Sequence, residues 1–93
     1  MIVIDKTFAA DGDSAVFAWQ GGEGVFTGVG TFGGGTATLR FSYDGSTYSN
    51  VGSDTTITAS GGGIFGYLHP CLMKVTLSGS TAPALTVKVA KND

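Results

Sequence analysis

The clearest chemical motif in this chain is a glycine pattern. Residues 28–33 read Gly-Val-Gly-Thr-Phe-Gly and match GxGxxG, the fingerprint of dinucleotide-binding loops. That chemistry needs a strand before the loop and a helix after it, so that N–H groups at the helix start meet the pyrophosphate. Here more glycine and then an alternating strand pattern follow, without a Walker lysine. We therefore interpret the match as chance in a glycine-rich segment and expect no cofactor.

The only histidine and the only cysteine stand two residues apart, at His69 and Cys71. On a strand this spacing puts both side chains on one face, as a zinc pair requires. A zinc site needs three or four ligands, and the sequence offers no second pair. Pro70 favours extended backbone at His69, and Cys71 fits an apolar strand face. We therefore expect no metal ion.

Catalysis by a Ser-His-Asp triad would have to use His69 as the base, because the chain has no other histidine. No serine stands in the glycine frame of a nucleophile elbow, and so small a domain leaves little room for a cleft. The chain is therefore predicted not to be an enzyme.

A polar segment, residues 42–48 (SYDGSTY), is similar to the Asp-box turn of sialidases, although it is one residue short between the aspartate and the glycine. Such boxes are structural turns, so the similarity predicts a turn and no activity.

Aromatic side chains could form a platform on which sugar rings stack, and the candidates are Trp19, Phe26, Phe32 and Tyr48. Aromatic residues in a small β domain more often lie in the core, but Trp19 stands at a strand end. Residues 21–35 hold eight of the 16 glycines, interleaved with apolar residues, and are predicted to form a glycine-kinked strand or a loop against which something packs. The possible interaction surface comprises Trp19, Val25, Phe26, Val29 and Phe32.

The elements that must position these side chains are strands. In residues 36–43, Ala37, Leu39, Phe41 and Tyr43 alternate with polar residues, which predicts one buried and one solvated face. Asp44-Gly45 and a short β segment at 47–51 follow and predict a hairpin with a two-residue turn. Alternation at 71–78 and 85–89, on either side of a turn region at 79–83, predicts a second hairpin.

Weaker strand patterns lie at 2–8, 15–20, 25–32, 55–59 and 64–69, and no window has helical periodicity. The whole chain, 1–93, is therefore predicted to be a single all-β domain. Its architecture is expected to be an antiparallel β-sandwich or jelly-roll-like barrel of about eight short strands.

The amino-acid composition limits the classes of partner that this chain can bind. Of the 93 residues, 13% are charged, and the net charge is −2. The five basic residues are scattered along the chain, so neither nucleic acid nor a membrane is an expected partner. The first residues, MIVIDKTFAADGD, match neither a signal peptide nor a transmembrane segment. A core this small, without a possible internal disulfide, is marginal and favours a homo-oligomer.

Several segments between residues 30 and 90 together resemble a known group of proteins. They are GTFGGGTATL at 30–39, FSYDG at 41–45, Tyr48, Val51-Gly52, a Thr-rich strand, and VTLSG at 75–79 with Ala82-Pro83 before Leu85-Thr86-Val87. This pattern resembles small β-rich virion proteins of tailed bacteriophages, including capsid decoration or cement proteins and small tail components.

The resemblance implies a structural protein that decorates and stabilises a phage capsid. Its implied partner is the major capsid protein, and its implied location is the capsid surface of a virion, after synthesis in the host cytoplasm. A trimer is favoured by analogy with proteins on three-fold capsid positions. A small tail or fibre-base component and a carbohydrate-binding module are the alternatives.

Overall fold

The computed structural model describes residues 2–91, and the side chains of all of these except residues 54 and 67. Within that range the chain forms ten strands and one short 3-10 helix, and all strand pairs are antiparallel. The elements are β1 (Ile2–Phe8), β2 (Gly12–Asp13), β3 (Phe17–Trp19), β4 (Gly22–Thr31), β5 (Thr36–Ser42), β6 (Ser49–Asn50), η1 (Ser53–Thr55), β7 (Thr56–Ile57), β8 (Gly61–Leu68), β9 (Cys71–Ser78) and β10 (Ala84–Lys91).

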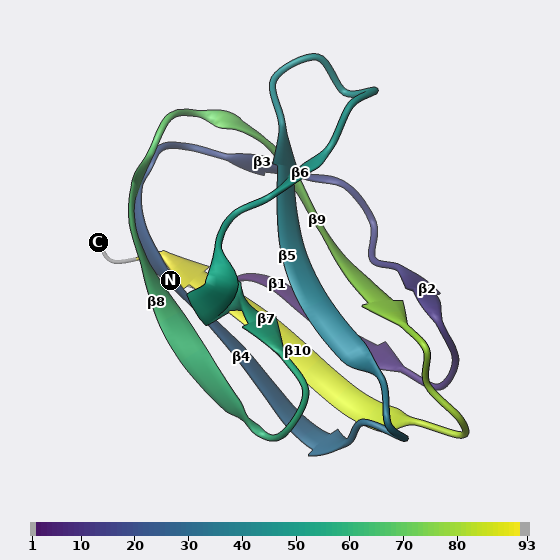
Figure 1. Ribbon diagram of the computed structural model, residues 1–93. Helices are drawn as coiled ribbons and strands as arrows, with labels where there is room; N and C mark the ends of the chain where they lie inside the picture. The colour runs from purple at the N-terminus through teal and green to yellow at the C-terminus, as the bar shows by residue number, and fades with distance from the viewer. Residues whose placement is uncertain (1, 92–93) are drawn as a thin grey trace.

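These strands form two sheets. The first sheet has the order β1-β10-β4-β8, and the second has β9 and β5 at its centre. In the second sheet β2 and β3 pair with one side of β9, while β6 and β7 pair with one side of β5. The two sheets lie as layers in a sandwich (Figure 1). The predicted all-β antiparallel sandwich is confirmed, with two-residue strands raising the count above the eight expected.

A single hydrophobic core fills the space between the sheets. The alternation of apolar and polar residues sends every second side chain inward, and each large apolar side chain so buried stabilises the fold by about 1.5–3 kcal/mol. The core contains Phe8, Trp19, Phe26, Phe32, Ala37, Leu39, Phe65, Met73, Val75, Leu77, Leu85, Val87 and Val89.

Glycines of β4 make room for aromatic rings of this core. A Cβ atom on Gly24 would lie 2.5 Å from Cζ of Phe65 and 2.6 Å from Cη2 of Trp19. Across β4 and β8, Gly24 stands opposite Phe65, and Phe26 stands opposite Gly63. The rings of Trp19 and Phe65 pack with their centroids 5.1 Å apart. The segment at 21–35, predicted to be a glycine-kinked strand or a loop, contains the strand β4 at residues 22–31 and a turn after it, and Gly24 serves packing.

The predicted alternation of residues 36–43 fails at its end. Ala37 and Leu39 are fully buried, but Ser42 is buried and Tyr43 is 64% exposed, so Tyr43 does not face the core as predicted. The reason is that β5 ends at Ser42, which stands opposite Leu72 on the outer side of the sheet. The loop that follows covers Ser42, whose hydroxyl accepts hydrogen bonds from the backbone N–H groups of Asp44 and Gly45.

The first predicted hairpin exists but has a longer connection. Ser49 pairs with Phe41 and Asn50 with Arg40, so the loop spans residues 43–48 instead of a two-residue turn. The Asp44 carboxylate holds this loop by accepting backbone N–H bonds of 2.8 Å from Ser46 and from Thr47. The similarity of this segment to an Asp-box turn therefore reflects local hydrogen bonding.

The second predicted hairpin is wrong, although both of its strands are present. β9 pairs with strands of the second sheet, whereas β10 pairs with β1 and β4 of the first sheet. Residues 79–83 therefore cross from one layer to the other. Alternation marks the buried face of a strand, but two strands on opposite sides of a core have the same pattern as two neighbours in one sheet.

Candidate interaction surface

The structure places the GxGxxG match and the His69–Cys71 pair in strands and turns of the sandwich. Gly28 and Gly30 lie within β4, Gly33 lies in the turn after it, and the strand β5 follows where a dinucleotide site would need a helix. His69 is exposed between β8 and β9, and Cys71 is partly buried at the start of β9, where burial raises the pKa of its thiol. Among residues 2–91, no three His, Cys, Asp or Glu side chains gather closely enough to hold a metal ion.

The predicted interaction surface is wrong for three of its five residues. Trp19, Phe26 and Phe32 are at most 6% exposed and belong to the core, so they can form neither a contact surface nor a platform for sugars. Trp19 is covered because β3 pairs with β9 and its ring packs against Phe65. Its indole Nε1 has no hydrogen-bond partner within the described part of the chain.

The other two predicted residues, Val25 and Val29, lie on the outer face of the first sheet. We define the apolar face as the uncharged outward side chains at the middle of this sheet: Val25, Thr27, Val29, Ile64, Thr86 and Ala90. Lys88 also points outward among them, opposite Thr27.

The strand register arranges the apolar face in rows. Val25 stands between Ala90 of β10 and Ile64 of β8, and Val29 stands beside Thr86. Ile64 and Val29 are 71% and 63% exposed. Ile64 is a surface residue that the sequence analysis omitted, and its position next to Val25 is visible only in the register.

The apolar face carries two open hollows, and charged side chains contribute to the lining of both. One hollow, of about 510 Å³, is lined by Thr27, Val29, Thr86 and Lys88. The other, of about 340 Å³, is lined by Val25 and Ile64 together with Glu23, Gly24 and Lys91. Lys88 reaches Asp5 of β1 at 3.9 Å, an exposed pair that contributes little to stability. A partner can cover the valines, Ile64 and the threonines at a small desolvation cost, but it must leave Lys88 in solvent or pair its charge.

The outer side of the second sheet is different. We define the polar face as Asp13, Arg40, Tyr48, Lys74 and Thr76. The Lys74 ammonium donates to Asp13 at 3.0 Å and lies 4.3 Å from the centre of the Tyr48 ring. The Thr76 hydroxyl donates to Asp13 at 2.7 Å, and Arg40 donates to the Tyr48 carbonyl at 3.2 Å. Asp13, Lys74 and Thr76 thus form a hydrogen-bonded network, whereas Nε of Arg40 is buried without a partner among the described residues.

The polar loops predict a specific response to acid. Backbone N–H groups of Thr47 and Ser46, with the Ser42 hydroxyl, lower the pKa of Asp44 to about 2. The pKa of Asp13 is lowered chiefly by the Thr76 hydroxyl, and that of Asp11 chiefly by the Ser80 hydroxyl. Because each folded pKa lies below its unfolded value, the stability these groups contribute is complete above about pH 4 and is lost as the pH falls towards 2.

We expect the urea midpoint of unfolding to fall between about pH 4 and pH 2. The Asp44→Asn variant keeps an acceptor oxygen but does not titrate, so its midpoint should change less over that interval. If the urea midpoint depended on pH equally in the two proteins, Asp44 would not contribute to the pH dependence of stability in the way its contacts indicate.

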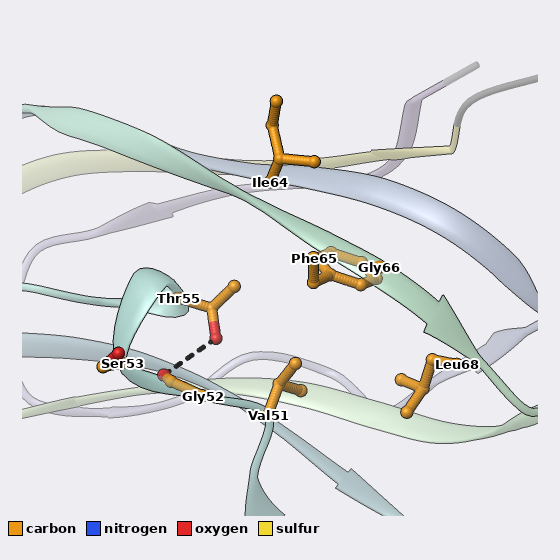
Figure 2. A pocket seen from close by; sticks show the side chains of 8 residues that line it. All are labelled: Val51, Gly52, Ser53, Thr55, Ile64, Phe65, Gly66 and Leu68. Carbon is orange, nitrogen blue, oxygen red and sulfur yellow. Dashed lines mark hydrogen bonds between the residues drawn. The ribbon is translucent and has the colours of Figure 1, made fainter.

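The flank of the sandwich beside β8 contains another hollow, of about 350 Å³ (Figure 2). Val51 and Leu68 point into it, and the Thr55 hydroxyl donates to the Gly52 carbonyl at 3.2 Å. Ile64, Phe65, Gly66 and Leu68 of β8 line its other side. Among the described side chains, its lining has no charged group and no histidine.

Comparison of the chain with known protein families, with curated proteins and with solved structures finds no match. No helix within residues 2–91 is long and apolar enough to span a membrane. The inference of function therefore depends on the two faces of the sandwich.

Proposed function

We propose that this chain is a non-enzymatic structural protein of a tailed-bacteriophage virion, which binds the outside of the capsid and stabilises it. The observation that carries the proposal is the difference between the two outer faces. The apolar face exposes Val29 and Ile64 beside threonines, with Lys88 and its partner Asp5 on the same side. The polar face carries the hydrogen-bonded Asp13, Lys74 and Thr76.

The apolar face suits a protein lattice as its partner. Burial of apolar area is the main driving force of association, and polar groups that are already paired gain little from a new partner. A rigid sheet changes shape little on binding, which keeps the cost of ordering low. The major capsid protein is the proposed partner, and the resemblance to phage virion proteins supports that choice.

The polar face would then point to solvent. Its hydrogen-bonded network of Asp13, Lys74 and Thr76 keeps the outer side of a coated particle hydrophilic. A tail or fibre-base component remains the alternative, since such a protein could use the same face. A carbohydrate-binding module loses its main support, because the Trp19 ring lies in the core.

Addition of the purified protein to undecorated mature capsids of its phage tests the proposal. Binding should saturate at a constant number of copies and raise the temperature at which the capsids rupture. A ligand that binds only the intact lattice stabilises it by about 2.7 kcal/mol per site at a hundredfold excess over Kd. Capsids that neither bind the protein nor gain thermal stability would refute a decorating role.

A further inference from the structure

The loop between β5 and β6, which projects from one end of the sandwich (Figure 1), contains a chemically reactive pair of residues. Asp44 is followed by Gly45. In such a pair the backbone nitrogen of the glycine can attack the aspartate side chain, because glycine has no side chain to hinder the approach. The product, isoaspartate, carries an extra methylene group in the main chain. The loop is therefore at risk of altering its own backbone unless its structure opposes the attack.

The conformation of the loop requires this glycine. Gly45 has a φ of 80°, in the left-handed region that residues with a side chain rarely adopt. A bulkier residue after Asp44 would slow the reaction, but it would strain the backbone at this position. The fold therefore keeps the reactive pair and has to oppose the reaction in another way.

Hydrogen bonds hold both of the reacting groups. The nucleophile, the Gly45 nitrogen, donates its hydrogen to the Ser42 hydroxyl at 2.9 Å. The electrophile, the Asp44 carboxyl group, accepts from the Ser42 hydroxyl at 2.8 Å. It also accepts from the backbone N–H groups of Ser46 and Thr47 at 2.8 Å each. Ser42 is only 2% exposed, so its hydroxyl has little freedom to release either group.

We infer that Asp44-Gly45 is a site of isoaspartate formation, which the hydrogen bonds around Ser42 keep unreactive in the folded chain. In the reaction the Gly45 nitrogen loses its proton and bonds to Cγ of Asp44, and Cγ loses a hydroxyl group. Water thus leaves, and a cyclic succinimide remains. Water from solvent then opens the ring: opening at Cγ restores aspartate, and opening at the main-chain carbonyl of Asp44 gives isoaspartate. The net mass does not change.

The hydrogen bonds oppose this reaction in two ways. The Gly45 nitrogen can attack only after its bond to Ser42 is broken, because its lone pair becomes available as the proton leaves. The carboxyl group must also be in its acid form to lose a hydroxyl group, and the backbone N–H groups of Thr47 and Ser46 lower the pKa of Asp44 to about 2. The acid form is therefore scarce at neutral pH, and the reaction has to wait until the loop opens.

Isoaspartate would alter more than the loop itself. The extra methylene group would lengthen the main chain before Tyr48, whose carbonyl accepts from Arg40 at 3.2 Å. The Lys74 ammonium lies 4.3 Å from the centre of the Tyr48 ring. These contacts join the loop to the polar face, so the reaction would disturb that face as well. The inference goes beyond the proposed function and does not depend on it, because it concerns the isolated chain.

A second Asp-Gly pair provides an internal control. Asp11 precedes Gly12, and the Asp11 carboxylate accepts from the backbone N–H groups of Gly79 and Ser80 at 3.1 and 3.0 Å. These contacts lie on a different connection of the sandwich and do not involve Ser42. Isoaspartate at both positions therefore reports unfolding of the whole chain, whereas isoaspartate at Asp44 alone reports opening of the loop.

Peptide mapping by mass spectrometry, after incubation of the folded chain for several weeks at neutral pH, tests the inference. Peptides with isoaspartate and aspartate have equal mass and are separated by chromatography. Ser42→Ala should accelerate the reaction at Asp44 at least about fivefold and leave Asp11 unchanged, because the lost hydrogen bonds raise the population of the open loop. Ser46→Ala is the matched control and should change neither rate, since among residues 2–91 Ser46 holds the loop only through its backbone N–H.

An unchanged rate at Asp44 in Ser42→Ala would overturn the inference, and so would equal acceleration by Ser46→Ala. Equal acceleration at Asp44 and Asp11 would also count against it, because unfolding of the whole chain would then be the cause. If circular dichroism shows that Ser42→Ala does not fold, the unaltered chain decides. Its reaction at Asp44 should be at least about tenfold slower in buffer than in urea, and equal rates would refute the protection.

Discussion

Replacing Gly24 with alanine should lower the free energy of unfolding by about 2 to 3 kcal/mol, which is typical of forcing an extra carbon into a packed core. The added Cβ would lie 2.5 Å from Cζ of Phe65, 2.6 Å from Cη2 of Trp19 and 2.8 Å from the carbonyl oxygen of Ala90. The two rings pack against each other, and the carbonyl belongs to the neighbouring strand, so none of the three can move alone.

Gly66→Ala is the control for this experiment. Gly66 lies on the adjacent strand β8, and a Cβ there would meet no atom within 4 Å. We expect a change of about 0.5 kcal/mol or less, in either direction. Urea unfolding of dilute protein measures both values. A Gly24→Ala variant as stable as Gly66→Ala would show that the rings of Trp19 and Phe65 do not pack over β4 as described.

The second large effect concerns capsid binding, and it depends on the proposed function. Val29→Lys should weaken binding to undecorated capsids at least tenfold, because it places a second ammonium group near Lys88, where the proposed contact would bury it. Val29 is 63% exposed and lies outside the core, so the fold should tolerate the change.

Val16→Lys is the matched control for capsid binding. Val16 is 51% exposed and lies between β2 and β3, both of which belong to the second sheet. Its substitution adds the same charge far from the apolar face, and affinity should change less than twofold. Stronger weakening by Val16→Lys than by Val29→Lys would mean that the other side of the sandwich meets the capsid.

Most strands of this fold could be predicted from alternation alone. The pattern at residues 2–8 predicts β1 with its observed bounds, and the patterns at 71–78 and 85–89 correspond to β9 and β10. Alternation reports which residues face a core, and it does so wherever one side of a strand is buried. The antiparallel sandwich follows from many such strands separated by turn residues.

The pairing of the strands could not be predicted in the same way. β9 and β10 are consecutive and both alternate, yet they lie in different sheets, because the largely exposed connection at 79–83 passes from one layer to the other. The Asp44 loop was mistaken for a two-residue turn, because a carboxylate that accepts several backbone N–H groups can stabilise a longer loop from the same residues.

The interaction surface was only partly predictable for a related reason. In the glycine-rich strand β4, Phe26 points inward while Val25 and Val29 point outward, and the sequence alone does not show which of the two faces is covered. Trp19 stands at a strand end, where exposure was a reasonable expectation, but the glycine at position 24 provides the space that buries its ring.

Quantitative mass spectrometry of purified phage particles tests the central claim most directly. A decoration protein repeats over the capsid lattice, so we expect the chain at a constant ratio to the major capsid protein, with on the order of hundreds of copies per particle. About a dozen copies would place the chain at the tail, and a particle that lacks it would contradict a role in the virion.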